Sequence, residues 1–252
     1  IMAELAGDYD LQYVHLHSHK GEGLTNGVRG ENISNMVVEL NVYESIYNHA
    51  ITGTLVIADS RNLISNLPIQ GTERLFFKLS NKLVNGSFLN TLDFTEKGGH
   101  PLHIYKITDR EQLNDSTQSY VIHFASREFV RNLRTKVSEA FTGTIDEMVT
   151  KILADKDYLD SKKTLFYQKT RNADKLVVPN TRPFKAIEML SKRALADDSK
   201  GAGYHFYETT KGFHFRSFES MSVDSRGLPR EVKQEFNYMP SLNTNPGITG
   251  VV

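Results

Sequence analysis

Apolar and polar residues alternate along the first half of the chain with a period of two, the pattern of half-buried β-strands. Val38, Leu40 and Val42 are expected to share one face of a strand, with Glu39 and Asn41 on the other. Turn segments separate such stretches, and only a short helical turn at 60–64 interrupts them. The expected strands cover residues 13–19, 36–45, 51–59, 74–80, 88–94, 102–109 and 119–126. So many strands without a long helix predict an antiparallel barrel or sandwich.

The period changes after Ser126, where helical spacing replaces alternation. Residues 127–136 are expected to form a helix, and Thr144 with Glu147 has the spacing of a capping box at the start of another. Apolar residues then recur at three- and four-residue steps and predict its buried face: Ile145, Met148, Val149, Ile152 and Leu153. Residues 156–178 are polar and are expected to be a connection with one short strand near 165–168.

The chain is organised around a helix that leads into an aromatic hairpin, at residues 180–218. Thr181 is the candidate N-cap, and Pro183 fits the first helical turn, where a missing N–H costs nothing. Two strands follow at 204–208 and 213–218. They carry six aromatic residues, so both faces of the hairpin are expected to be apolar: Tyr204, Phe206, Tyr207, Phe213, Phe215 and Phe218. Replacement of Phe213 or Phe215 by Ala is predicted to destabilise the fold by roughly 3 to 5 kcal/mol. Residues 222–252 are rich in loop-forming residues, with one strand expected at 232–238.

Composition narrows the classes of function. The 252 residues contain 30 Lys plus Arg and 30 Asp plus Glu, a balance that argues against a surface that coats nucleic acid or binds anionic membranes. There is no cysteine, which excludes disulfides, thiolate chemistry and Cys–zinc sites. No apolar run is long enough to span a bilayer, and residues 1–4 lack the features of a secretion signal. We therefore expect neither a membrane-spanning segment nor a secretion signal.

Three histidines form the sharpest candidate for chemistry. His15, His17 and His19 would fall on one face of a strand, and imidazole is a common ligand of zinc, copper and nickel. The spacing resembles the His-x-His of metal-dependent amidohydrolases, but those sit on an α/β barrel, whereas the residues that follow here alternate as antiparallel strands. A polar strand face near a terminus is therefore the preferred interpretation, and a metal-dependent hydrolase remains the alternative.

Other motifs are weaker. Gly21, Gly23, Gly27 and Gly30 follow a strand, but no Gly-Lys-Ser/Thr and no helix comes next, as a phosphate loop requires. The chain has no Gly-x-Ser-x-Gly elbow, no distinct carboxylate pair and no basic platform interleaved with aromatic residues. We therefore predict no catalytic, cofactor-binding or metal-binding residues and no cofactor.

The order of the predicted elements along the chain resembles that of a known protein family. The relevant stretches are 44–60, 67–73, Pro183-Phe184-Lys185-Ala186-Ile187, and the hairpin 206–215. Across residues 36–240 the chain resembles the baseplate hub proteins of contractile-tailed bacteriophages, which are related to the hub part of type VI secretion spike proteins. In that family each chain has two similar barrel domains with an inserted helical domain. Three chains then form a ring of six barrels between the sixfold tail tube and the threefold spike.

The resemblance implies a fold, a set of partners and a location. The expected fold is α+β, mainly β: an antiparallel tube-type β-barrel domain at 1–125, a helical insertion subdomain at 126–200, and a return hairpin and tail at 201–252 that leads to or completes a second β-domain. The second barrel is either reduced or lies beyond Val252.

The implied function is that of a trimeric structural protein of the phage tail baseplate, made in the host bacterial cytoplasm and without enzymatic activity. Its expected partners are copies of itself, the central spike, the tail tube or tube initiator, and neighbouring baseplate proteins. DNA would pass through the lumen only in transit, and no membrane insertion is expected. A β-rich carbohydrate-binding module is the further alternative.

Overall fold

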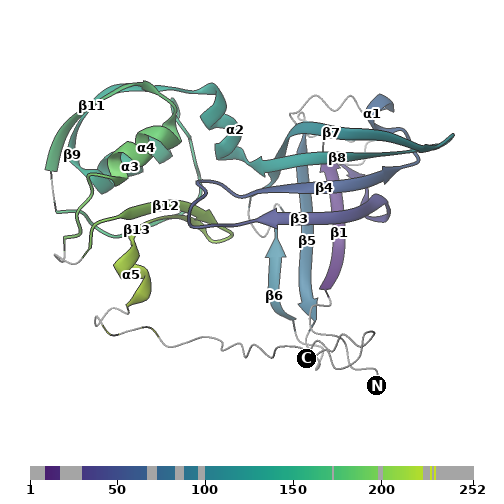
Figure 1. Ribbon diagram of the computed structural model, residues 1–252, viewed down its shortest axis with the longest axis horizontal. Coiled ribbons are helices and arrows are strands. Elements are labelled where there is room, and N and C mark those ends of the chain that lie inside the picture. The colour runs from purple at the N-terminus through teal and green to yellow at the C-terminus, as the bar shows by residue number, and fades with distance from the viewer. Residues whose placement is uncertain are drawn as a thin grey trace, which may run out of the picture.

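Two hydrophobic clusters divide the computed structural model into two packing units (Figure 1). We call them the sheet unit, which ends at Ser126, and the mixed unit, which begins at Arg127. The structure describes residues 9–17, 30–66, 73–82, 88–95, 100–171, 173–197, 201–223, 228 and 230. The strand expected at 232–238, together with His19, Gly21, Gly23 and Gly27, lies outside these residues.

The sheet unit is an antiparallel sheet of eight strands, folded so that its two halves enclose one core. The strand order is β2-β1-β5-β7-β8-β4-β3, with β6 beside β5. Pairing between β5 and β7 is limited to Arg74 with His103 and Leu75 with Leu102, and the sheet turns at this corner. Figure 1 shows β3, β4, β7 and β8 crossing the direction of β1, β5 and β6. The strands are β1 (Tyr9–His17), β2 (Glu31–Asn32), β3 (Val37–Tyr43), β4 (Thr52–Asp59), β5 (Arg74–Lys82), β6 (Phe88–Asp93), β7 (Leu102–Asn114) and β8 (Thr117–Ser126).

The sheet is bent but not closed. In the described part of the chain no ladder joins β3 to β1 or β2, so the closed barrel expected from the sequence is not observed. Instead the 3₁₀-helix η1 (Ser34–Met36) bridges the two ends. The Ile33 N–H donates to the carbonyl of Val14 at 2.9 Å, and the Val14 N–H donates to Ser34 Oγ at 2.8 Å. The short helix α1 (Leu63–Asn66) lies where a helical turn was expected.

A β-bulge changes the expected face of β3. The register with β4 shifts between Val37 and Glu39, which gives the strand one extra residue. Val37, rather than Val38, therefore joins Leu40 and Val42 against the core. Val38 is 66% exposed. The expectation that Val38 faces inward was wrong, because a bulge breaks the period of two.

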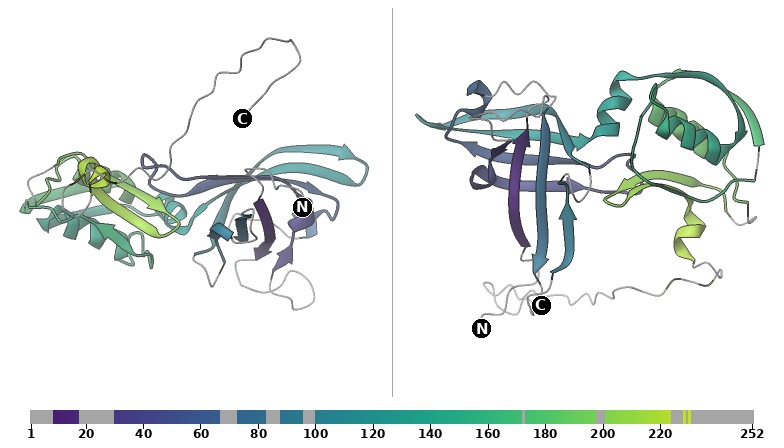
Figure 2. Two further views of the ribbon diagram at one scale, coloured as in Figure 1. Left: turned by 90° about the horizontal axis from the view of Figure 1, so that it is seen from below. Right: turned by 180° about the vertical axis from the view of Figure 1, so that it is seen from behind.

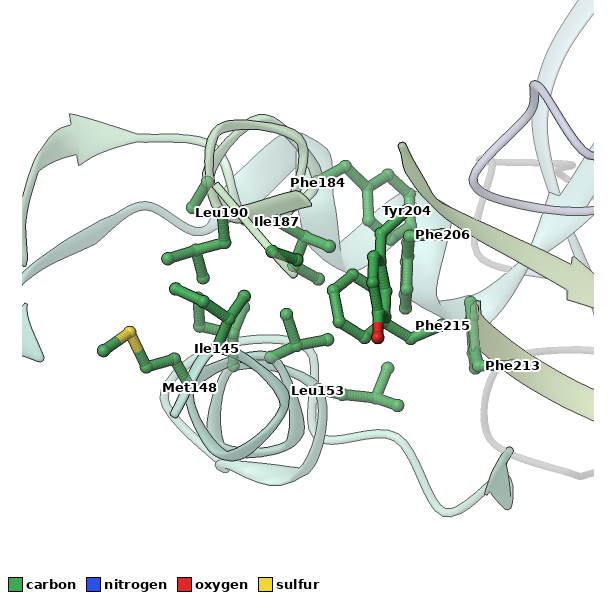
Figure 3. Close-up of a cluster of buried hydrophobic side chains, with 14 of the residues drawn as sticks. Ile145, Met148, Leu153, Phe184, Ile187, Leu190, Tyr204, Phe206, Phe213 and Phe215 are labelled. Atoms are coloured by element: carbon green, nitrogen blue, oxygen red, sulfur yellow. The ribbon is translucent and has the colours of Figure 1, made fainter. Parts of the chain in front are cut away.

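The mixed unit packs two helices and a hairpin around the second core, shown in Figure 3. Helices α2 (Arg127–Arg134), α3 (Ile145–Ala154) and α4 (Pro183–Ser191) confirm the sequence prediction, and so does the capping box at Thr144. Arg182, not Thr181, is the N-cap of α4. The hairpin of β12 (Tyr204–Thr209) and β13 (Gly212–Ser217) is also confirmed, and it pairs in parallel with β10 (Leu165–Tyr167). A short helix, α5 (Phe218–Ser222), follows and includes Phe218, which was expected to be the last residue of the strand.

Two strands of the mixed unit were not expected. Strands β9 (Val137–Thr144) and β11 (Ala173–Thr181) form an antiparallel ribbon, so the polar connection predicted at 156–178 is partly a strand. The predicted domain boundaries at residues 125 and 200 stay predictions. The hairpin after residue 200 shares one core with the helices before it, because Phe206, Phe213 and Phe215 contact the same cluster as Leu153 and Ile187.

Candidate functional site

The mixed unit contains a buried ionic cluster beside the sheet unit, centred on Lys163, which lies between α3 and β10. We call Glu128, Lys163 and Glu208 the junction cluster. The Lys163 ammonium donates to Glu128 Oε2 at 2.9 Å and also forms an ion pair with Glu208. Their side chains are 8%, 2% and 1% exposed for Lys163, Glu128 and Glu208 respectively, so all three groups are removed from water. Glu128 comes from α2 and Glu208 from β12, so the cluster joins three segments far apart in sequence.

The junction cluster also holds the sheet unit directly. The Ile51 N–H, immediately before β4, donates to Glu208 Oε2 at 2.9 Å. The carbonyl of the same residue accepts the N–H of Ser126 at 3.0 Å, at the end of β8. A second contact lies nearby, where His49 Nδ1 is 2.9 Å from the carbonyl oxygen of Phe206. The residues just before β4 are therefore held to β12 by the Ile51–Glu208 hydrogen bond and by the His49–Phe206 contact.

The electrostatics of the cluster favour the charged forms of Lys163 and Glu128 but not that of Glu208. Burial lowers the pKa of Lys163, but the carboxylates of Glu208 and Glu128 outweigh burial and raise it. Burial acts to raise the pKa of Glu128, and the charge and hydrogen bond of Lys163 reverse this, so that its pKa is lowered. Burial dominates at Glu208, whose pKa is raised. Each of the three groups is occupied by another, which is the arrangement of a structural ion cluster rather than of a free acid or base.

Two small hollows border the cluster. One of about 150 Å³ is lined by His103 and Arg127, the other of about 160 Å³ by Lys163 and Glu208, and His100 lines both. Burial, followed by the charges of Arg74 and Arg127, lowers the pKa of His103 to about 4. These hollows are too small for most organic substrates.

The histidines singled out from the sequence do not converge. His15 and His17 lie on one face of β1 with ring centroids 6.3 Å apart. His15 packs edge-on against Tyr13, and His17 packs against Phe76 at 4.3 Å between centroids. Among the described residues no group of three or more His, Cys, Asp or Glu side chains is placed to hold a metal ion.

Gly30 has a structural reason to be glycine. Its φ is +85°, and a Cβ atom there would lie 2.2 Å from Cδ2 of His17. The residue lets the backbone approach the His17 ring closely, which accounts for it without a phosphate.

Exposed apolar residues gather along the outer edge of the sheet unit. Strand β3 pairs only with β4, so its other edge is free in the part of the chain that the structure describes. Val38 is 66% exposed, and Tyr43 and Tyr47 also face solvent. The hairpin between β7 and β8 projects beyond the rest of the sheet, as Figure 2 shows, and carries Leu113 near its tip with 57% exposure. None of the described helices is both long enough and apolar enough to cross a membrane.

Sequence reasoning missed the junction cluster, although one signal was present. In β12 the period of two places Glu208 on the same face as Tyr204 and Phe206, which are both buried. A carboxylate at an inward position requires a partner. The sequence offered no comparable signal for Lys163, because it lies outside any regular element.

Comparisons with known proteins agree with this architecture. No protein-family model matches the chain, and no curated protein matches its sequence. Among solved structures, prophage tail protein gp18 from Listeria monocytogenes matches 90% of this chain and 56% of its own length, with a TM-score of 0.51 and 8% identity. A 43 kDa tail protein of prophage MuSo2 from Shewanella oneidensis is also similar. The match covers 81% of this chain and 54% of the tail protein, with 9% sequence identity and a TM-score of 0.46.

A third solved structure comes from a secretion system. A type VI secretion component from E. coli, described as structurally similar to T4 bacteriophage tail proteins, matches 86% of this chain and 50% of its own, at 9% identity and TM-score 0.40. The chain spans about half the length of these proteins. The resemblance drawn from the sequence is thus confirmed at the level of the fold: this β-rich α+β chain has the fold of a prophage tail protein.

Proposed function

We propose that this chain is a structural part of a contractile-tail baseplate hub. In this proposal three copies form a ring that joins the sixfold tail tube to the threefold central spike and lines the channel through which DNA passes. The chain is made in the bacterial cytoplasm, has no enzymatic activity, and becomes part of the virion. In this proposal the sheet unit corresponds to the tube-type domain and residues 126–200 to the helical insertion, and the hairpin after residue 200 leads to a second β-domain.

The observation that carries the proposal is the fold shared with the Listeria prophage tail protein over 90% of this chain. The free edge of β3 supports it, because an unpaired strand with exposed apolar residues is suited to contact another chain. The equal numbers of acidic and basic residues, 30 of each, are compatible with a channel that does not hold DNA by its phosphates.

Light scattering of the purified protein, alone and with the spike protein, tests the proposal. We expect a trimer in one of the two conditions. Val38→Glu, which places a charge at the free edge of β3, is expected to reduce trimer formation. Val177→Glu is the matched control, because Val177 is 67% exposed on β11 of the mixed unit. A wild-type protein that stays monomeric in both conditions would contradict the hub role.

Metal analysis separates this proposal from a hydrolase. We expect no stoichiometric metal in the purified protein. Tightly bound zinc, lost together with hydrolytic turnover when His15 and His17 are replaced by Ala, would support the enzyme instead.

A further inference from the structure

Strand β10 is an open edge of the three-stranded sheet in the mixed unit. The strand order is β10-β13-β12, so β10 has one neighbouring strand, β13. The carbonyl of Thr164 accepts an N–H of β13, and the N–H of Gln168 donates to a carbonyl of β13, both at 2.9 Å. Backbone groups of successive strand residues point to opposite sides, so those of Leu165 and Tyr167 point away from β13. In the part of the chain that the structure describes, no hydrogen bond occupies them.

A groove of about 460 Å³ lies between Tyr167 and helix α3. Its other wall is one flank of α3, which runs from Asp146 to the C-cap residue Asp155. Tyr167 lies on the same sheet face as Leu165, whose side chain packs against the core of the mixed unit. The sheet therefore ends at β10 before it covers this flank of α3, and a fourth strand beside β10 would extend it over the groove.

The groove is acidic. Asp146, Glu147 and Asp155 line it together with one basic residue, Lys151, which already pairs with Glu139. None of the three groove carboxylates takes part in an ion pair with another described residue. Opposite charges attract and like charges repel, so the groove favours a segment with basic side chains over an acidic one.

We propose that β10 and this groove bind an extended, basic segment of another protein, which adds a fourth strand beside β10. Recognition by strand addition takes its affinity from main-chain hydrogen bonds and its specificity from sites that receive alternate side chains. Leu165 and Tyr167 supply the main-chain groups, and the groove carboxylates select Lys or Arg. The Tyr167 side chain is 45% exposed, so its ring is available to a guanidinium group. The site is independent of the hub role, which uses the free edge of β3.

A labelled peptide, Thr-Arg-Thr-Arg-Thr-Arg-Thr, tests the site by fluorescence anisotropy with the whole chain. On a strand its arginines share one face. We expect saturable binding, together with new protection from hydrogen exchange at the amides of Leu165 and Tyr167. The same peptide with Glu in place of Arg is expected not to bind. A version N-methylated at alternate residues keeps the charges but loses main-chain donors, and should bind at least about fivefold more weakly.

Two variants place the binding at this edge. Glu147→Gln/Asp155→Asn removes two charges, while the amide oxygens can still accept the N–H groups of Thr144 and Asp157. Tyr167→Pro removes an outward N–H at an edge strand, where proline is tolerated. Each variant is expected to weaken binding of the arginine peptide by at least about threefold.

The matched control removes charge elsewhere on the mixed unit. Glu188→Gln/Asp174→Asn is expected to leave the affinity unchanged. Absence of binding, equal binding of the N-methylated peptide, or equal weakening by the groove and control variants would overturn the proposal. The peptide comparisons use the wild-type protein, so they hold even if a variant does not fold. Protection of the Leu165 and Tyr167 amides before peptide is added would also overturn it, because this chain or a second copy would then occupy the edge.

Discussion

Phe215 is the side chain whose removal is expected to affect the mixed unit most directly. It is fully buried on β13, and its ring centroid lies 4.8 Å from that of Tyr204. Phe215→Ala removes a ring that cannot be replaced by water and leaves a cavity in a core shared with α3 and α4. Buried Phe→Ala substitutions cost about 3 to 5 kcal/mol, from lost transfer energy and from the cavity. We expect a loss in this range in the free energy of unfolding of the mixed unit.

Urea denaturation followed by circular dichroism measures this loss, and hydrogen exchange locates it. Amides of β12 and β13 should lose protection, while those of β4 and β8 should keep theirs, because the sheet unit has its own core. Phe218→Ala is the matched control, since Phe218 follows the same hairpin but is 57% exposed. We expect a cost below about 0.5 kcal/mol for that surface change. A loss below about 1 kcal/mol for Phe215→Ala, well under the buried-ring range, would refute the assignment of this ring to the core.

Three further predictions concern packing, pH and capping. Gly53→Ala should destabilise the sheet unit by about 1 to 3 kcal/mol in urea denaturation, because its Cβ would lie 2.3 Å from both the Asn41 carbonyl oxygen and the Phe124 ring; an unchanged midpoint would contradict this. The pKa of His103 is lowered to about 4, so the folded state resists protonation and wild-type stability should fall as pH drops from about 6.5 to 4. The stability of the His103→Gln variant should fall less over that range. An equal dependence of stability on pH in the variant and the wild type would refute the prediction. Glu147→Ala should lower the free energy of unfolding of the mixed unit by about 1 kcal/mol in thermal denaturation, because the Glu147 carboxylate accepts the N–H of the N-cap Thr144 at 3.1 Å. A higher free energy of unfolding in the variant would contradict this prediction.

Much of the fold follows from local pattern in the sequence. Strand β4 alternates between partly and fully buried residues along its whole length, and such a strand is read directly from its period of two. The ribbon of β9 and β11 was missed because β11 has a single buried residue, Val178, while the adjacent Val177 is exposed. The continuous apolar run Leu176-Val177-Val178 hides the alternation of β11, in which Leu176 and Val178 lie against the core. The bulge at Val38 was missed for a related reason, since an inserted residue leaves no mark in composition.

The candidate site could be predicted only in part. Glu208 was recognisable as a carboxylate on the inward face of an aromatic strand, which requires a buried partner. The identity of that partner was not accessible, because Lys163 is 45 residues away and lies in a connection between elements. Conversely, the three histidines near the start attracted attention by their spacing alone, and His15 and His17 prove to pack against aromatic rings. Spacing in a strand places residues on one face but does not bring other ligands to them.

The measurement that tests the central claim most directly is an electron cryo-microscopy map of the tail assembly that contains this protein. The hub role predicts three copies around the tail axis, between the tube and the spike, with the free edge of β3 against a neighbouring chain. The sheet unit and the mixed unit should have the same relative orientation in every copy. A map that places the chain away from the axis as a single copy, or an assembly that is complete without it, would contradict the account.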